Sequence, residues 1–319
     1  MRVAITGATG FLGRHLVPAA LRAGHEVTVL VRPGAARPVG VQSVAGHLGD
    51  STALHRLVDG VEAVIHLAAV GVQARSRQWD AMIATNVVDP QRLLVAAHAA
   101  GVERMVALGT CLEYQGHGKL PGAPAAGAPR CHEGDELEAV EPYGASKAAG
   151  GLLLRSRART AGLPCWYLRL AAVYGPDDDS EKVLPAAAAA ARENRPMDLS
   201  GGEQVREWIF VDDAVAAVLV AATTPPPDGV DAINVGTGEA HRLVDVAYRI
   251  FDLAGADRAL LRRGALPYRA GEAHHLVMTH ELARRALGGW EPKVGLDDGL
   301  QRLLGVERAS AGAIKGFGG

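Results

Sequence analysis

The chain has 319 residues, enough for one large domain or two smaller ones with a substantial core. Hydrophobic residues make up 48% of it, and the net charge of −2 offers no general attraction for nucleic acid. No run approaches the ~18 apolar residues of a membrane span, and we expect no signal peptide. Cys111, Cys131 and Cys165 lack metal-ligand spacing, so we expect free thiols in a reducing cytoplasm and no metal.

Short apolar runs alternate with helical patterns through the first half of the chain. The predicted strands are 2–6, 25–31, 41–48, 62–69, 103–110 and 163–170. The predicted helices are 12–24, one capped by Asp50 or Ser51, one at about 77–100, and 143–160. Strands that alternate with helices form right-handed crossovers, which predicts an α/β fold of the Rossmann type with a doubly wound parallel sheet.

Beyond residue 175 the alternation breaks down, and the segments become mixed and loop-rich. We therefore expect a smaller, mixed C-terminal substrate lobe beside the Rossmann domain. The predicted parts are a Rossmann domain at 1–175 to which 207–236 returns, a substrate lobe at 176–206 and 237–308, and a flexible tail at 309–319. The Gly- and Pro-rich segment 115–135 is long for a loop and is a candidate lid.

The segment TGATGFLG, residues 6–13, joins the first strand to the first helix. Gly7 permits a tight turn, Gly10 lets the backbone approach a pyrophosphate, and Gly13 lets helix and strand pack closely. The start of the following helix offers free N–H groups and the positive end of its dipole. This position, directly after the first strand, predicts a dinucleotide-binding turn.

The end of the second predicted strand indicates which dinucleotide is bound. An NAD site usually carries Asp or Glu there, but this chain has Val31 followed by Arg32. Arg14, just after the third glycine, is a second guanidinium near the expected adenosine ribose. Two guanidiniums suit a 2′-phosphate, which predicts NADP, with NAD as the less favoured cofactor. The other reading is that both are surface residues of an arginine-rich protein.

The segment EPYGASKAAG places Tyr143 and Lys147 four positions apart, on one face of a predicted helix. A free tyrosine has a pKa near ~10 and is a weak acid at neutral pH. Because a lysine ammonium one turn away favours the phenolate, we expect Lys147 to lower the pKa of Tyr143.

The glycine turn and the Tyr-Lys pair together resemble the extended short-chain dehydrogenases/reductases, in the subgroup of nucleotide-sugar epimerases, dehydratases and reductases. Matching segments run through about 1–308: TGATGFLG, HLAA (66–69), Asn86, YGASK, RLAAVYGP (169–176), REWIFVDD (206–213), INVGTG (233–238) and RAGE (269–272). The resemblance implies that Thr110 orients the substrate oxygen and Tyr143 donates the proton. It also implies that Lys147 tunes Tyr143 and binds the nicotinamide ribose.

Further contacts follow from the turn and the resemblance. The expected cofactor-binding residues are Gly7, Thr9, Gly10, Phe11, Leu12, Gly13, Arg14, Arg32, His47, Leu48, Leu67, Ala68, Ala69, Asn86, Tyr143 and Lys147. The expected substrate-binding residues are Thr110, Cys111, Tyr143, Arg206 and Arg269. Arg206 and Arg269 resemble the family's arginines that hold the substrate diphosphate, and the alternative is again plain surface arginine. Asn86 anchors either a water or the helix kink behind Lys147.

Departures from the family pattern narrow the expected reaction. The family's 4,6-dehydratases carry Asp and Glu directly after the Thr, where this chain has Cys111 and Leu112, so we do not expect dehydration. The pattern GTCxEY instead resembles reductases of nucleotide-linked 4-keto-6-deoxy sugars. Ala172 replaces an Asn of the family's RxxNxYGP pattern, which alters the expected pose of the substrate. We expect Glu113 and Tyr114 to shape the sugar pocket or hold the loop, and plain packing is an equal alternative.

The sequence therefore predicts NADPH-dependent reduction of the keto group of a nucleotide-linked 4-keto-6-deoxy sugar. An NAD-dependent nucleotide-sugar 4-epimerase uses the same residues and is the first alternative, opposed by Arg32. A reductase of a non-nucleotide ketone is the second, opposed by Arg206 and Arg269. A dinucleotide-sensing protein without turnover is a further alternative. It is opposed by the complete set of Thr110, Tyr143 and Lys147, which such a protein would not need.

The outer faces of the helices near 77–100 and 143–161 are rich in Ala and Leu, as in VAAHAAG and KAAGGLLL. In the family such helices pair between subunits, which predicts a homodimer. The other interpretation is that these faces only pack on the sheet.

Overall fold

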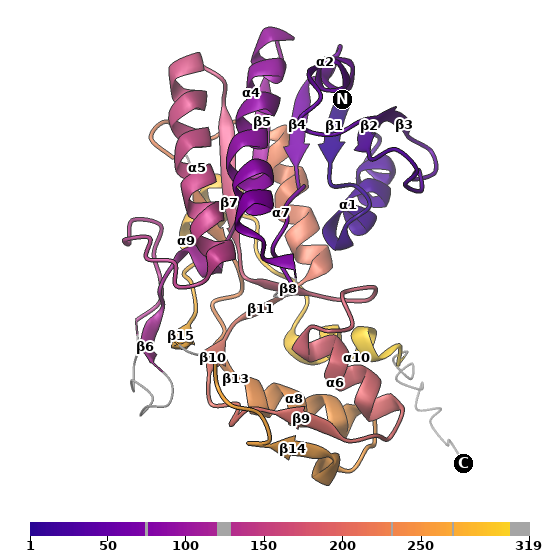
Figure 1. Ribbon diagram of the computed structural model, residues 1–319, viewed down its shortest axis with the longest axis vertical. Coiled ribbons are helices and arrows are strands. Elements are labelled where there is room, and N and C mark those ends of the chain that lie inside the picture. The colour runs from indigo at the N-terminus through magenta and orange to yellow at the C-terminus, as the bar shows by residue number, and fades with distance from the viewer. Residues whose placement is uncertain (74–75, 120–128, 231, 270, 307–319) are drawn as a thin grey trace, which may run out of the picture.

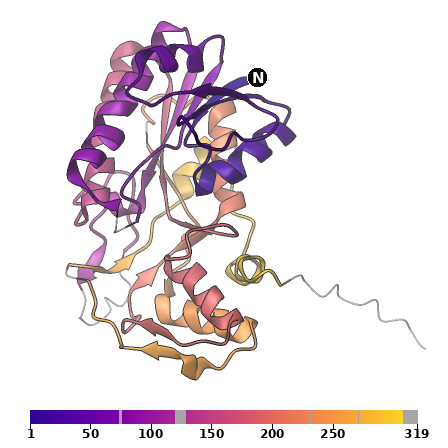
Figure 2. The same cartoon turned by 45° about the vertical axis from the view of Figure 1, so that its right-hand side comes forward.

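The computed structural model describes residues 1–73, 76–119, 129–230, 232–269 and 271–306. The predicted tail and the middle of the candidate lid segment lie outside the described residues. Figure 1 shows a large sheet flanked by helices, with a smaller group of helices and short strands below it. Figure 2 shows from a second direction that this smaller group lies beneath one end of the sheet.

The large sheet has seven parallel strands in the order β12-β7-β5-β4-β1-β2-β3. Their bounds are β1 Arg2–Thr6, β2 Glu26–Val31, β3 Gln42–Ala45, β4 Ala63–His66, β5 Arg104–Thr110, β7 Cys165–Leu170 and β12 Ile233–Val235. The strand order reverses direction next to β1, as in a doubly wound sheet. The predicted Rossmann-type α/β fold is confirmed.

Helices cover both faces of this sheet, as the two core clusters show. Val3 and Ile5 of β1 pack with the α1 and α7 side, whereas Ala4 packs with the α2, α4 and α5 side. This alternation follows from the two-residue period of a strand, with both faces buried. The helices are α1 Phe11–Arg22, α2 Ser51–Val58, α3 Trp79–Met82, η2 Ile83–Val88, α4 Asp89–Ala99, α5 Pro142–Ala161 and α7 Val211–Thr223.

One predicted helix begins as expected, and another is divided into three segments. Asp50 is the N-cap of α2, and its carboxylate accepts a hydrogen bond from the backbone of Ala53 at 3.1 Å. The single helix expected at about 77–100 is instead α3, a π-helical segment (η2) and α4. The wider turn at η2 contains Asn86, and such segments often mark functional sites.

The remaining elements form the smaller part and its connections. The strands are β6 His117–Lys119, β8 Ala172–Tyr174, β9 Met197–Leu199, β10 Val205–Arg206, β11 Trp208–Phe210, β13 His241–Arg242, β14 Leu261–Arg263 and β15 Ala273–Leu276. The helices are η3 Cys111–Glu113, α6 Val183–Arg192, α8 Leu243–Leu253, η4 Arg258–Leu260, α9 Glu281–Ala286 and α10 Leu296–Leu304. They build the sheets β13-β10-β15-β6, β11-β8 and β14-β9. The domain boundaries drawn from sequence stay a prediction about folding units.

None of the described helices is long and apolar enough to cross a lipid bilayer.

Candidate active site

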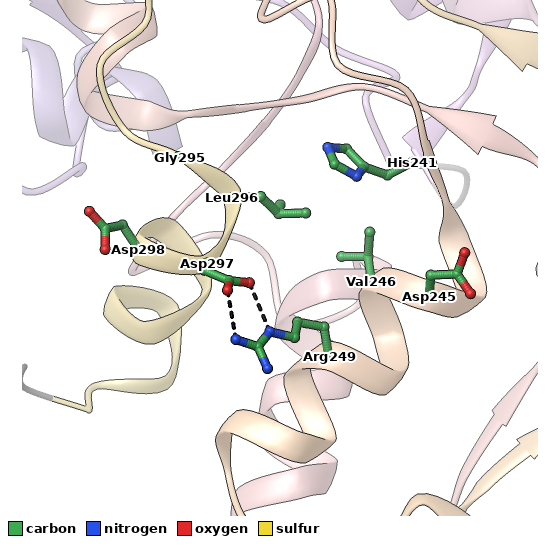
Figure 3. Close-up of a pocket in the computed structure, with 8 residues that line it drawn as sticks. All are labelled: His241, Asp245, Val246, Arg249, Gly295, Leu296, Asp297 and Asp298. Atoms are coloured by element: carbon green, nitrogen blue, oxygen red, sulfur yellow. Dashed lines mark hydrogen bonds and ion pairs between the residues drawn. The ribbon is translucent and has the colours of Figure 1, made fainter.

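A cavity of about 1050 Å³ lies at the carboxyl ends of the central strands, where open α/β sheets bind their ligands. Gly7, Leu67, Thr110 and Leu170, which follow or end β1, β4, β5 and β7, all line it. A smaller hollow of about 510 Å³ lies between α8 and α10, where Arg249 and Asp297 form a double hydrogen bond (Figure 3). No predicted catalytic residue lines that hollow, so the large cavity is the candidate active site.

The glycine turn forms one end of this cavity, through Gly7, Gly10, Phe11, Leu12 and Gly13. Gly7 has φ +75°, and a Cβ there would lie 2.6 Å from the backbone nitrogen of Ala68. A Cβ on Gly13 would lie 2.3 Å from the carbonyl oxygen of Gly7. Helix α1 begins here without a side-chain cap, and its first N–H groups have no partner within the helix. This cradle fits the pyrophosphate of a dinucleotide.

Thr110, Tyr143 and Lys147 line the same cavity. Thr110 ends β5, and its hydroxyl caps η3 by accepting the Leu112 backbone N–H at 3.3 Å. Tyr143 and Lys147 lie in the first two turns of α5, and both are buried. The strand end and the helix therefore bring together the hydroxyl, phenol and amine that the sequence singled out.

Burial controls the ionisation of these groups. Burial raises the pKa of Tyr143 above its usual value, the Glu113 and Cys111 charges add to this, and Arg77 opposes it. Burial lowers the pKa of Lys147 to about 8, and Glu113 opposes that change. The expected lowering of the pKa of Tyr143 by Lys147 is wrong here, because the loss of hydration on burial is the largest effect on this phenol. Tyr143 is thus a protonated phenol, ready to donate.

Cys111 follows Thr110 and also lines the cavity. Burial, reinforced by the charge of Glu207, raises the pKa of its thiol to about 12. The thiol is therefore protonated at neutral pH and is a poor nucleophile.

Asn86 holds the wall of the site together and does not line the cavity. Its amide accepts from the Val70 backbone N–H at 3.0 Å and donates to the Val70 carbonyl and the Ser146 hydroxyl, each at 2.9 Å. These bonds join the chain after β4, the η2 turn and helix α5. Asn86 therefore anchors the kink behind Lys147, one of the two roles considered from sequence.

Other predicted cofactor residues lie away from the cavity lining: Thr9, Arg14, Arg32, His47, Leu48 and Ala68. Arg14 donates to the backbone carbonyls of Thr9 at 3.1 Å and Asp177 at 2.6 Å. Arg32 and His47 are exposed beyond the ends of β2 and β3. Leu67 and Ala69 do line the cavity.

The two arginines predicted for the substrate line the opposite side of the cavity. Arg206 donates to Glu272 at 3.0 Å and to the Ala273 carbonyl at 2.9 Å. The side chain of Arg269 is 68% exposed, and its Nη1 lies 3.7 Å from a carboxylate oxygen of Glu141. Both cations thus have carboxylate partners.

Sequence reasoning missed several charged groups around the cavity. Arg77 pairs with Glu141 at 2.6 Å and donates to the Gly71 carbonyl at 3.1 Å. Glu207 accepts from the backbone N–H groups of Thr237 and Met278, and burial raises its pKa to about 7. The segment REWIFVDD contains Glu207, but the sequence of this segment does not show that the Glu207 side chain is buried.

Comparisons with known proteins agree with this geometry. The model of the NAD dependent epimerase/dehydratase family matches residues 3–236. The chain is similar to a UDP-glucose 4-epimerase of Mycolicibacterium smegmatis (30% identity; 95% of this chain, 97% of the relative). It is also similar to a 2-alkyl-3-oxoalkanoate reductase of Stenotrophomonas maltophilia (27%; 95% and 98%). Among solved structures, MoeE5 in complex with UDP-glucuronic acid and NAD superimposes with a TM-score of 0.84 (27%; 96% and 98%).

Proposed function

Because the chain belongs to the NAD-dependent epimerase/dehydratase family of extended short-chain dehydrogenases/reductases, we propose that it reduces the keto group of a nucleotide-linked 4-keto-6-deoxy sugar. The family membership makes it an oxidoreductase-type enzyme with a nicotinamide dinucleotide as cofactor. The proposal adds the direction of the reaction, the class of sugar and a preference for NADPH.

The observation that carries the proposal is the chemistry directly after Thr110. Cys111 is a protonated thiol, Leu112 is apolar, and the Glu113 carboxylate is buried away from the cavity against Arg169. Among these residues, none has an ionised group that could remove a proton from a sugar carbon. The segment directly after Thr110 therefore leaves acid–base chemistry to the neighbouring Tyr143, which supports reaction at the carbonyl.

The residues then divide the work as follows. NADPH, held at the turn of Gly7, Gly10 and Gly13, would supply the hydride for the carbonyl carbon. Thr110 holds the carbonyl oxygen with its hydroxyl, and the Tyr143 phenol gives that oxygen its proton. Lys147, as an ammonium, would bind the nicotinamide ribose, and its positive charge stabilises the phenolate that Tyr143 becomes when it gives up its proton. The raised pKa keeps the Tyr143 phenol protonated, so the proton that the reduced oxygen needs is held beside Thr110.

The preference for NADPH rests on Arg32 following β2 in place of an acidic residue. Arg14 is the second cation, although its guanidinium donates to backbone carbonyls. We expect Arg32→Asp to reverse the preference, measured as kcat/KM with each cofactor. Equal kcat/KM for NADPH and NADH in the wild type would reject it.

A nucleotide-sugar 4-epimerase with retained NAD is the second candidate. The similarity to a UDP-glucose 4-epimerase and to an NAD-bound neighbour favours it. A reductase of a non-nucleotide ketone is the third, favoured by the similarity to a 2-alkyl-3-oxoalkanoate reductase and opposed by Arg206 and Arg269 in the cavity wall.

We further propose that the enzyme is a homodimer. Trp79, Ile83 and Val95, together with Leu152 and Leu153 of α5, are large apolar side chains exposed to solvent on neighbouring helices. A second copy would bury them. We expect a dimeric mass at micromolar concentration and a monomeric mass for the variant that carries both Leu152→Glu and Leu153→Glu.

The test of the reaction is a panel of nucleotide 4-keto-6-deoxy sugars, each incubated with NADPH, followed by NMR of the products. We expect one of them to be converted to the 4-hydroxy sugar with one NADPH oxidised per turnover. Conversion of non-nucleotide ketones alone would assign the third candidate instead.

A further inference from the structure

A buried ion pair lies directly behind the catalytic residues. The side chain of Glu113 in η3 is 0% exposed, and that of Arg169 in β7 is 2% exposed. Nε of Arg169 donates to Oε2 of Glu113 at 2.9 Å. Such pairs lose much hydration when they are buried, so stability alone is a weak reason to keep one. The other contacts of the carboxylate indicate what it does.

The second oxygen of Glu113 reaches both catalytic elements. Oε1 accepts the Thr110 backbone N–H at 2.9 Å, which fixes the end of β5. The Tyr167 hydroxyl lies 2.9 Å from this Oε1 and 2.8 Å from the carbonyl oxygen of Lys147. One carboxylate therefore joins the residue that orients the substrate to the helix turn that carries the amine.

Helix α5 packs closely against the residues around Glu113. A Cβ on Gly151 would lie 2.3 Å from Cζ of Tyr167, and a Cβ on Gly144 would lie 2.0 Å from the Leu112 carbonyl oxygen. These glycines let α5 press directly on the Tyr167 ring and on η3. The position of Lys147 therefore depends on the side chains around Glu113.

Glu113 also acts on Lys147 through its charge. The titratable groups near Lys147 are Tyr143 on the same helix, His66 at the end of β4, Glu113 in η3 and Tyr167 in β7. Burial lowers the pKa of His66 to about 3 and raises the pKa of both tyrosines. Burial lowers the pKa of Lys147 to about 8, close to neutral pH, and the charge of Glu113 opposes this change.

We propose that Glu113 is a positioning residue of this active site: with Tyr167 and Arg169 it fixes Thr110 and Lys147 relative to each other, and its negative charge holds the Lys147 ammonium. The proposal rests on the proposed function only in giving Lys147 and Thr110 their roles. For Glu113 it answers the choice left open by the sequence, since this side chain holds the loop and does not line the cavity, whereas Tyr114 lines it.

The first test is Glu113→Gln, with kcat/KM measured against pH. Activity that needs the Lys147 ammonium is present below the pKa of Lys147 and is lost as pH rises through it. Because Glu113 raises that pKa, its removal should move the basic limb to lower pH. A folded Glu113→Gln enzyme with the basic limb of the wild type would overturn the proposed charge effect.

The second test keeps the ion pair intact, because Glu113→Gln leaves Arg169 without its carboxylate and folding can fail. Tyr167→Phe removes only the hydroxyl between Glu113 and Lys147. We expect kcat to fall about 10-fold, the typical worth of one such hydrogen bond, with KM and the basic limb unchanged. An unchanged kcat would overturn the positioning role, whether or not Glu113→Gln folds.

Tyr114→Phe is the matched control. Tyr114 is equally buried and accepts from Arg169 at 3.0 Å, but its hydroxyl donates to Asn234 on β12 at 2.7 Å. We expect Tyr114→Phe to lower the thermal stability of the protein. The kcat of Tyr167→Phe should lie well below the kcat of Tyr114→Phe. Equal losses of kcat in the two variants would reduce the network to general packing and contradict the proposal.

Dinucleotide binding separates this proposal from the proposed reaction. The pH dependence of NADPH affinity, followed by nicotinamide fluorescence, also reports on Lys147 and needs no sugar substrate. A wild type that reduces no ketone of the panel, with a downward shift of this dependence in Glu113→Gln, would reject the reaction and support the positioning role. Absence of the shift in the folded variant would reject the charge effect.

Discussion

The two sides of the cavity differ in how their polar groups are held. On the sheet side, Tyr143 and Lys147 are buried, and Thr110 is fixed by a capping box with Glu113. On the opposite side, Arg206 and Arg269 hold carboxylates of the protein itself. The groups proposed for catalysis are therefore already assembled in the protein alone, whereas the cations proposed to bind the substrate would have to share or exchange partners. Pre-assembly of the reacting groups serves catalysis, and exchangeable partners suit a ligand that must enter and leave.

The largest expected effect is on the catalytic side. Tyr143→Phe removes the proton donor while the ring still fills its buried place, so kcat should fall by ~10²–10⁴-fold. The fold and NADPH binding should persist, as measured by circular dichroism and fluorescence titration. Wild-type turnover by a folded Tyr143→Phe enzyme would remove Tyr143 from the mechanism.

Stability should divide along the same line between buried and exposed pairs. Arg169→Met leaves the Glu113 carboxylate buried without its cation and should cost about 3–5 kcal/mol in the free energy of unfolding. The control is Arg249→Met, whose pair with Asp297 is exposed (Figure 3) and is worth about 0–1 kcal/mol. Urea denaturation measures both. Equal costs would contradict the assignment of the buried pair to the support of the site.

Thr110→Val tests the second catalytic contact. Valine keeps the shape of the side chain but cannot donate to the carbonyl oxygen, so kcat should fall on the order of 10²-fold. The hydroxyl also caps η3, so thermal melting must accompany the kinetics. A rise in KM with unchanged kcat would assign Thr110 to substrate binding alone.

On the substrate side, Arg269→Ala should raise the KM for the nucleotide sugar about 10-fold, the loss of one charge-assisted hydrogen bond, and leave kcat nearly unchanged. Arg258→Ala is the control, because Arg258 is similarly exposed and pairs with Asp252 away from the cavity. If the two variants have the same KM, Arg269 does not bind the diphosphate.

The smallest effect is expected at Cys111. Cys111→Ala should change kcat/KM less than the other active-site variants, because a protonated, half-buried thiol behaves as a small hydrophobic side chain. Steady-state kinetics with and without a thiol-alkylating reagent measure this. Loss of turnover in Cys111→Ala, with Tyr143→Phe spared, would favour a thiol-based epimerisation over reduction.

Local sequence patterns predicted the parts of the site that depend on neighbouring residues. The glycine turn at Gly7–Gly13 and the Tyr143–Lys147 spacing each lie on one strand–turn or one helix, so their geometry is encoded within a few positions. Asp50 as a helix cap is of the same kind. The parallel sheet then follows from the alternation of strands and helices.

Features that depend on distant residues or on burial were not predictable in this way. Glu113 and Arg169 lie 56 positions apart and meet because β5 and β7 are neighbours in the sheet. The pKa of Tyr143 goes the opposite way from the expectation, because the spacing of Lys147 says nothing about lost hydration. The π-helical turn at η2 interrupts an otherwise regular helical pattern. In this turn Asn86 bonds to Val70 and Ser146, which lie 16 and 60 positions away in the sequence.

The most direct test of the proposed reaction follows the hydrogen atom itself. The enzyme is mixed with NADPH that carries deuterium on the transferred position of C4 and with a nucleotide 4-keto-6-deoxy sugar, and the product is analysed by NMR and mass spectrometry. We predict one deuterium at C4 of the product sugar for each NADPH oxidised. A parallel mixture holds a 4-hydroxy nucleotide sugar in place of the keto sugar. Conversion of that sugar to its C4 epimer with no net oxidation of NADPH, together with no deuterium in any product of the keto sugar, would contradict the account and assign the enzyme as an epimerase.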